Sequence, residues 1–212
     1  LNFPPLWSRA ADSRPRRKGG CHRPEYHDWA RFVRGFAAHY RGKIRSVEIW
    51  NEPDHPGFAN FSGEEYVELL KTAYREIKAV APELSVLSGG VAGLQSEEQK
   101  RLFRMILKSR SCDMLAFHGH GGLGGYRPQV ANLLKLRREA GADTPWFANE
   151  TAISAILIGE LRQAEILFQK FLYSWANGAS GYNWYDLRND GGDPGNNEHN
   201  FGLLTCDIRP KA

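Results

Sequence analysis

Two asparagine–glutamate pairs are the residues of this sequence best suited to chemistry. Asn51 and Glu52 follow the stretch SVEIW, and Asn149 and Glu150 follow the stretch PWFA. Both stretches have the short apolar or alternating pattern of a β-strand. A strand ordinarily ends in a simple turn, but each of these ends in an amide beside a carboxylic acid, and Pro53 then stops the first. The two stretches therefore share one pattern, a strand followed by asparagine and glutamate.

Two carboxylates on separate strands that converge supply what acetal hydrolysis requires. One acid must protonate the leaving oxygen while the other, ionised, attacks or stabilises the anomeric carbon. Their surroundings must separate the two pKa values so that both forms coexist near neutral pH. One glutamate alone is more often a solvated loop acid, but the matching asparagines favour a catalytic pair of Glu52 and Glu150. Glu48 also points inward, and we interpret it as a buried, hydrogen-bonded strand residue.

Strand-like and helix-like patterns alternate along the sequence. The apolar runs that predict strands cover residues 1–6, 44–50, 84–87, 114–117, 146–148 and 182–185. The predicted helical faces consist of Trp29, Phe32, Val33, Phe36 and Tyr40, of Tyr66, Leu69, Leu70, Ala73 and Ile77, and of Leu161, Ala164, Phe168, Phe171, Leu172 and Trp175. Capping boxes mark two helix starts, Ser62 with Glu65 and Ser96 with Gln99. This alternation predicts a parallel sheet, either doubly wound or closed into a (β/α) barrel.

Polar residues at the strand ends favour the barrel. In (β/α) barrels, functional side chains collect at the C-terminal ends of many strands. The polar strand-end residues here are Asn51, Glu52, His118, Asn149, Glu150 and Asp186. A closed barrel has eight strands and about 250 residues, whereas these 212 residues predict about six strands. The predicted fold class is therefore α/β of the (β/α)8 TIM-barrel type, incomplete, with residues 1–212 forming a single domain.

Three motifs give the sequence a resemblance to a known group of enzymes. VEIWNEPD (residues 47–54) resembles the strand-four motif of clan A retaining glycoside hydrolases, especially family 39 and related family 5-like enzymes. WFANET (146–151) is similar to their strand-seven motif, and GYNWYDL (181–187) is similar to their strand-eight motif. The resemblance implies a catalytic (β/α)8 barrel and a carbohydrate substrate.

The resemblance also assigns roles to individual residues. It implies that Glu52 is the acid/base and that Glu150 is the nucleophile. It implies that Asn51 hydrogen-bonds the sugar 2-hydroxyl and that Trp184 forms the apolar platform under the sugar. We expect Asn149, directly before the nucleophile, to lie among the substrate-binding residues.

The rest of the sequence matches this pattern with gaps. FPPLW near the start resembles the end of strand three, so the resemblance implies a fragment that begins there. On this alignment the sequence lacks strands one and two, the arginine that the family supplies from strand two, and the eighth helix. We therefore expect another segment or a complementary chain to complete the barrel. After strand six, the candidates for substrate binding near the nucleophile are His118, His120 and Tyr126, and the sequence leaves open which of them has that role.

A glycine pattern in the same region suggests a different function. Gly119, Gly121 and Gly124 satisfy G-x-G-x-x-G, which binds dinucleotides when a helix starts inside the glycine run and an acid ends the next strand. Pro128 predicts a later helix start, and Asp143 precedes the next strand instead of ending it. We therefore favour a flexible loop over a sugar cleft.

The composition excludes several other classes of protein. With 42% hydrophobic and 12% aromatic residues, the sequence does not have the composition of a disordered chain. It has no run of about 18 apolar residues, so no membrane-spanning helix is expected. The basic run at residues 13–20 is interpreted as a solvated loop, because no nucleic-acid recognition fold accompanies it. Three cysteines without metal-site spacing allow one disulfide, and we expect no metal and no cofactor.

The main rival to a glycosidase is a non-catalytic or partner-dependent barrel remnant that binds carbohydrate without cleaving it. A doubly wound nucleotide-binding protein is the third hypothesis. The sequence does not define the sugar, the linkage, or endo against exo action. It also leaves the compartment open, although a polysaccharide substrate favours a secreted or periplasmic location.

Overall fold

The computed structural model describes residues 1–11 and 22–211, in which helices and strands alternate. The α-helices are α1 (Tyr26–Tyr40), α2 (Gly63–Val80), α3 (Glu97–Ser109), α4 (Leu123–Glu139) and α5 (Glu160–Ala176). The strands are β1 (Ser46–Glu48), β2 (Ser85–Leu87), β3 (Leu115–His118), β4 (Trp146–Thr151) and β5 (Ala179–Trp184). Three short 3-10 helices are η1 (Leu6–Ser8), η2 (Ala155–Leu157) and η3 (Asn197–Asn200). Cys112 and Cys206 are free thiols, while Cys21 and the basic run at 13–20 lie outside the described residues.

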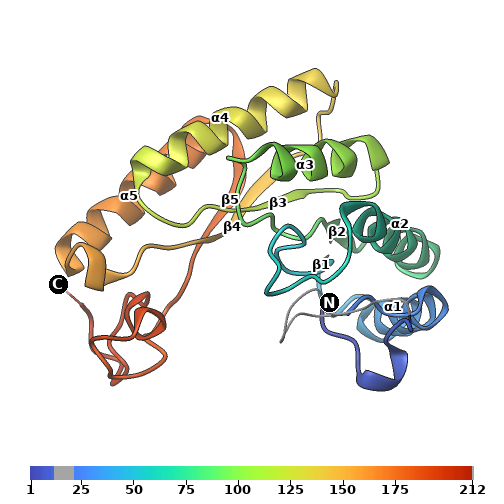
Figure 1. The fold of residues 1–212 in the computed structure, drawn as a ribbon, viewed down its shortest axis with the longest axis horizontal. Helices are drawn as coiled ribbons and strands as arrows, with labels where there is room; N and C mark the ends of the chain where they lie inside the picture. The colour runs from blue at the N-terminus through green and yellow to red at the C-terminus, as the bar shows by residue number, and fades with distance from the viewer. Residues whose placement is uncertain (12–21, 212) are drawn as a thin grey trace.

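The strands form a curved wall with parallel pairing in chain order. β1 pairs with β2, and β3 pairs with β4, which pairs with β5. Parallel bridges at Leu87–Met114 and Val91–Phe117 join the two groups. Figure 1 shows the helices along the outside of an arc and the strands on its inner side. This order is that of a (β/α) barrel wall, and the predicted incomplete TIM barrel is confirmed.

The first predicted strand, residues 1–6, is not a strand in the structure. Only Leu1 lies alongside β1, where its amine donates to Glu48 O at 2.6 Å and its carbonyl accepts from Trp50 N at 2.9 Å. Pro4 and Pro5 follow, and neither has an N–H for a strand ladder. The chain then turns into η1.

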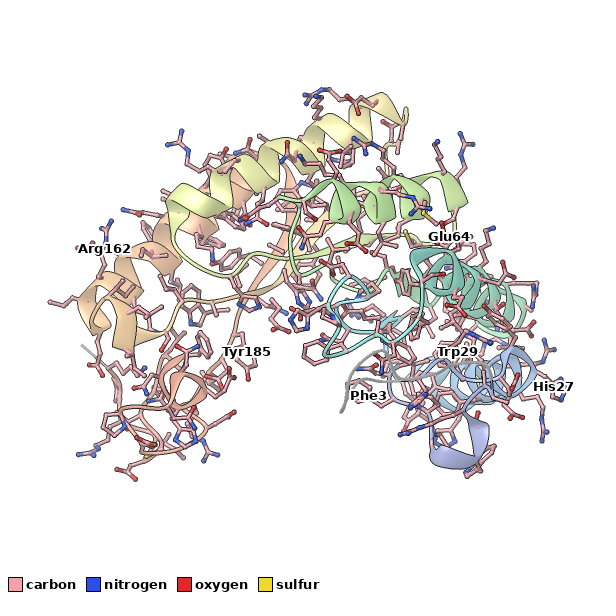
Figure 2. The ribbon with its side chains drawn as sticks, in the orientation of Figure 1. Phe3, His27, Trp29, Glu64, Arg162 and Tyr185 are labelled. Atoms are coloured by element: carbon pink, nitrogen blue, oxygen red, sulfur yellow. The ribbon has the colours of Figure 1, made fainter. Side chains whose placement is uncertain are left out.

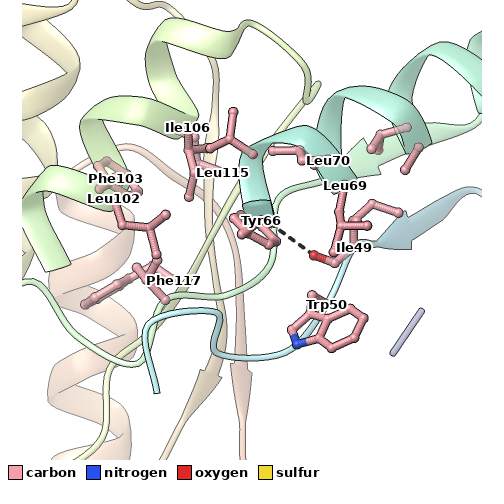
Figure 3. Packing of buried hydrophobic residues seen from close by; sticks show 14 of the residues in the cluster. Ile49, Trp50, Tyr66, Leu69, Leu70, Leu102, Phe103, Ile106, Leu115 and Phe117 are labelled. Carbon is pink, nitrogen blue, oxygen red and sulfur yellow. Dashed lines mark hydrogen bonds between the residues drawn. The ribbon is translucent and has the colours of Figure 1, made fainter. Parts of the chain in front are cut away.

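Buried aromatic residues between the wall and the helices fix the end of β1. Tyr66 of α2 is fully buried, and its hydroxyl donates to Ile49 O at 3.1 Å and accepts from Gly89 N at 2.6 Å (Figure 3). The Trp50 indole donates to Phe58 O at 3.0 Å. Both capping boxes form as predicted, at the starts of α2 and α3. The core therefore holds the backbone that leads into Glu52.

The prediction of which face of α5 packs inward is wrong. The side chains of Leu161, Phe168, Leu172 and Trp175 in α5 are 70%, 59%, 49% and 70% exposed. The buried residues of α5 are instead Gln163, Ile166, Lys170 and Ser174. The polar members of this set bind carbonyl or hydroxyl oxygens of neighbouring segments, so each keeps hydrogen bonds in place of water.

The start of α4 also differs from the prediction. The helix begins at Leu123, inside the glycine run, and Pro128 lies within it. Its first turn therefore contains Gly124 and Gly125, which add no side-chain bulk.

No helix in the described residues is long and apolar enough to span a membrane.

Candidate active site

Four polar side chains meet at one edge of the strand wall. Ligand-type atoms of Glu52, His118, His120 and Glu150 all lie within 4.8 Å of one another. These residues lie at or after the carboxyl ends of β1, β3 and β4. They meet because parallel strands place their carboxyl ends at the same edge. The convergence that the sequence predicts is present in the structure.

The backbone after β1 directs Glu52 into this cluster. Trp50 and Glu52 have left-handed φ values of 74° and 42°, which cost non-glycine residues on the order of 1–3 kcal/mol each. In a regular strand these two side chains would share a face. The left-handed turns instead bury Trp50 in the core and direct Glu52 to the strand ends, where it is only 7% exposed. A hydrogen bond from Glu52 N to Gly90 O, 3.0 Å long, fixes this arrangement.

An irregularity in β4 brings two consecutive side chains to the inner face. The pairing of β3 with β4 shifts just before the pair His118–Glu150, and β4 contains one residue more than β3 there. A β-bulge of this kind re-aims side chains near functional sites. Asn149 donates to Glu48 Oε2 at 2.9 Å, while the neighbouring Glu150 contacts the histidines.

His118 lies between three carboxylates and is 1% exposed. Its Nδ1 lies 3.0 Å from Glu52 Oε1, and its Nε2 lies 3.9 Å from Glu150 and 4.0 Å from Glu48. Burial lowers the pKa of His118, but the hydrogen bond to Glu52 and the three negative charges outweigh it, so that the pKa is raised. The three carboxylates around the ring therefore favour its protonated form.

The nucleophile candidate Glu150 has a second imidazole partner. His120 Nε2 lies 3.3 Å from Glu150 Oε1 and 3.9 Å from Glu52 Oε1. Burial raises the pKa of Glu150, but the hydrogen bond from His120 and the charges of both histidines outweigh it, and the net pKa is lowered. Glu150 is therefore held as a carboxylate, the form that an attacking group needs.

Glu48 lies beneath the cluster as a hydrogen-bonded strand residue, as interpreted from the sequence. It accepts from Gly90 N at 2.7 Å and from the Asn149 amide at 2.9 Å. Burial raises the pKa of Glu48, and these hydrogen bonds and the charge of His118 partly counteract it. Asn149 thus donates a hydrogen bond to Glu48, and its role in substrate binding stays a prediction.

Gly90 is a site residue that the sequence analysis missed. A Cβ built at this position would lie 2.1 Å from His118 Nε2, so only glycine leaves room for the imidazole. Its signal in the sequence is the Gly-Gly pair at 89–90, one residue after the apolar strand that ends at Leu87. The partner of that glycine is a histidine from the next strand, which a local pattern does not reveal.

The four residues of the cluster, two histidines and two glutamates, are of types that bind transition metals. Two imidazoles and two carboxylates within 4.8 Å could surround one cation. His118 Nδ1, however, is already hydrogen-bonded to Glu52 Oε1, and the raised pKa of the ring favours its protonated form, which is not a ligand. The donor set is therefore better matched by its own ion pairs, and the absence of a metal stays a prediction.

The expected sugar-contacting residues have different positions. Trp184 is half-buried at the end of β5, where its indole donates to Phe201 O at 3.0 Å, and Asn51 is partly exposed beside Gly90. Tyr185, directly after Trp184, lies on the inner side of the arc (Figure 2). Tyr126 is not a site residue: it is fully buried in α4, and its hydroxyl is 2.7 Å from Ser174 Oγ.

Local geometry accounts for two of the three glycines in the pattern, Gly119 and Gly121. A Cβ on Gly119 would lie 2.2 Å from the Tyr126 ring, and Gly121 has a φ of 83°. The helix start inside the run meets one requirement of a dinucleotide site. Lys170 of α5 donates hydrogen bonds to the carbonyls of Gly119 and Gly121, so the loop is held against α5, whereas the sequence predicts a flexible loop.

Comparison with known proteins gives matches among solved structures. Neither a protein-family model nor a curated protein matches the sequence. A family 39 glycoside hydrolase from the gut symbiont Bacteroides cellulosilyticus WH2 is 23% identical, with a TM-score of 0.73 over 90% of this chain and 43% of that chain. A GH39 β-xylosidase from Caulobacter crescentus is 21% identical, with a TM-score of 0.74 over 100% of this chain and 51% of that chain. The GH53 catalytic domain of Ignisphaera aggregans is 18% identical, with a TM-score of 0.68 over 88% and 64%.

These likenesses show the fold. The chain has the (β/α)-barrel architecture of these structures, and it spans about half the length of the two family 39 structures. At these identities the chemistry must be argued from the site itself.

Proposed function

We propose that this chain carries the catalytic pair of a retaining glycoside hydrolase that cleaves O-glycosidic bonds of an oligo- or polysaccharide. The supporting observation is that a carboxylate oxygen of Glu52 and one of Glu150 lie within 4.8 Å of each other. Retaining glycosidases hold their carboxyl groups about 5–5.5 Å apart, and inverting ones about 6.5–9.5 Å apart. The short separation favours direct attack by one carboxylate over attack by an intervening water.

In the first step, Glu150 attacks the anomeric carbon as the glycosidic C–O bond breaks. Its lowered pKa keeps the carboxylate ionised for this attack. Glu52 gives its proton to the departing oxygen, so that the leaving group departs as an alcohol. His118 Nδ1, 3.0 Å from Glu52 Oε1, hydrogen-bonds this carboxyl group and fixes its orientation.

In the second step, water releases the sugar from the glycosyl-enzyme ester. Glu52, now a carboxylate, accepts a proton from the water as the oxygen attacks the anomeric carbon. The bond to Glu150 breaks, the nucleophile is restored, and Glu52 is again protonated. Two displacements at one carbon give net retention of configuration.

The substrate side of the site supplies a platform and an amide. Trp184 offers a half-buried aromatic face at the end of β5, and such faces stack on the apolar sides of pyranose rings. Asn51, directly before the acid/base, offers a partly exposed amide for a sugar hydroxyl. The loop after Glu52 lines a separate cavity of about 360 Å³ against the starts of α2 and α3, and neither Glu52 nor Glu150 is among its lining residues.

Covalent trapping tests the proposal directly. The chain is incubated with a panel of dinitrophenyl 2-deoxy-2-fluoro glycosides, and the adduct is located by mass spectrometry of the intact chain and its peptides. We expect one glycosyl adduct on Glu150 and none on Glu150→Gln. Glu52→Gln still forms the adduct, because dinitrophenolate leaves without a proton, but it turns over natural glycosides poorly.

The matched control is Glu139→Gln, an exposed helical acid that should trap as the parent chain does. An adduct that persists on Glu150→Gln overturns the assignment of the nucleophile. Sugar binding without any adduct across the panel would support the rival hypothesis, a barrel that binds carbohydrate without cleaving it.

A further inference from the structure

A buried lysine lies behind the active site and takes no part in the proposed reaction. Lys170 of α5 is 0% exposed. Its Nζ donates to the carbonyl oxygens of Gly119 and Gly121, the latter at 3.1 Å. These two carbonyls flank His120, which contacts Glu150. One amine thus holds both ends of the backbone segment that carries His120.

The same amine also contacts two aromatic rings. Lys170 Nζ lies 4.8 Å from the centre of the Tyr126 ring and 5.7 Å from the centre of the Trp184 ring. Amines over ring faces are attracted to them. Lys170 therefore joins the loop after β3 to the end of β5, where the expected sugar platform lies.

This arrangement is costly for a residue with only a packing role. Burial lowers the pKa of Lys170 from its ordinary value of 10.5 to about 7, and no charged partner counteracts it in the described residues. A methionine has similar length, fills space readily and has no amine to desolvate. The hydrogen bonds that the amine donates offset this cost.

Gln163, two turns earlier on the same face of α5, makes comparable contacts. Its amide donates to Ile153 O at 2.8 Å and to Phe201 O at 3.1 Å. Phe201 O also accepts from the Trp184 indole. The buried face of α5 thus binds segments that follow β3, β4 and β5, which explains why it is polar.

We propose that Lys170 is a positioning residue that sets His120 against Glu150 and holds Trp184 in place from α5. This role rests on the proposed glycosidase function for its kinetic consequences. The positioning itself is independent of activity and has its own readout.

The first test observes the histidine ring. In ¹H–¹³C spectra, assigned with His120→Ala, the His120 ring signals should shift or broaden in Lys170→Met. They should stay unchanged in Ile106→Val, which loosens the core at α3 without touching this loop. They should also stay unchanged in Lys135→Met, the same chemical change on an exposed face. Unchanged signals in a folded Lys170→Met overturn the proposal, whatever the protein's activity.

The second test is a double-mutant cycle on the rate of trapping by the 2-fluoro glycoside. A misplaced catalytic contact costs up to about 100-fold in rate, and we expect Lys170→Met to lose activity within this limit. If Lys170 acts through His120, adding Lys170→Met to His120→Ala causes little further loss. Fully additive losses overturn the coupling. Absence of trapping by the parent chain refutes the glycosidase function and leaves the spectroscopic test decisive for positioning.

Discussion

At the scale of single residues, the charge on Glu150 depends on its two histidines. Since His120 lowers the pKa of Glu150 and burial raises it, His120→Leu should move this pKa upward. The nucleophile must be ionised, so activity is lost as pH falls through its pKa. The acidic limb of kcat/KM against pH should therefore shift to higher pH in His120→Leu, and an unshifted limb would contradict the assigned electrostatics.

Gly90 provides a steric test of the same cluster. Gly90→Ala places a methyl group 2.1 Å from the present position of His118 Nε2. The imidazole must move, and displacement of a catalytic group by about 1 Å costs on the order of 100-fold in rate. We expect this loss in kcat/KM with the fold retained by circular dichroism. Gly35→Ala is the control, because nothing lies within 4 Å of its added Cβ, and an equal loss there would refute the steric argument.

These residues show what local sequence can and cannot reveal. The meeting of Glu52 and Glu150 was predictable because each follows an apolar strand beside an asparagine, a pattern contained in a few consecutive residues. The roles of Gly90 and Asn149 were not, because each depends on a partner in another strand: His118 for Gly90 and Glu48 for Asn149. The bulge in β4 also decides which side chains face inward, and the sequence carries no plain signal for it.

At the scale of elements, α5 shows how hydrophobic periodicity misleads. The apolar residues have helical spacing, and such a stripe ordinarily faces a core. The structure buries Gln163, Lys170 and Ser174 instead, because the loops and α4 beneath this helix present carbonyl and hydroxyl groups. The parallel strand order was predictable from alternation alone, whereas the orientation of this helix depends on what it covers.

The buried amine of α5 gives this helix a pH-dependent contribution to stability. Lys170 releases its proton near pH 7 when folded and near pH 10.5 when unfolded, so the unfolded chain holds more protons between these values. Stability from this residue therefore rises with pH across that window, and its penalty is fully present below pH 7. We expect the Tm of the parent chain to rise relative to that of Lys170→Met between pH 7 and pH 10. A Tm difference between the two proteins that stays constant with pH would contradict the lowered pKa of Lys170. Tyr126, in contact with the amine, has a pKa of about 12 and therefore does not titrate in this window.

At the scale of the whole molecule, the described chain is an arc of barrel wall with two uncovered ends (Figure 1). Within the described residues, β5 pairs on one side only, and the free side of β1 carries only Leu1. Unpaired strand edges are templates for further pairing. Beside β5, the outer stripe of α5 exposes Leu161, Phe168, Leu172 and Trp175. In a closed barrel each strand edge is paired and each helix has neighbours, so these surfaces fit the further strands and helices of a complete barrel.

This exposed stripe predicts how the chain behaves alone. Contiguous exposed apolar side chains promote association, so the chain of residues 1–212 should self-associate as its concentration rises. Leu161→Lys with Phe168→Lys should reduce that association in sedimentation velocity without lowering the Tm, because both side chains are already more than half exposed. Ala164→Lys with Ala176→Lys adds the same charge to exposed positions of α5 and keeps its large apolar side chains. If both double variants reduce association equally, charge and not the stripe governs it. If only the first does, the stripe is the contact surface through which a completing segment would bind.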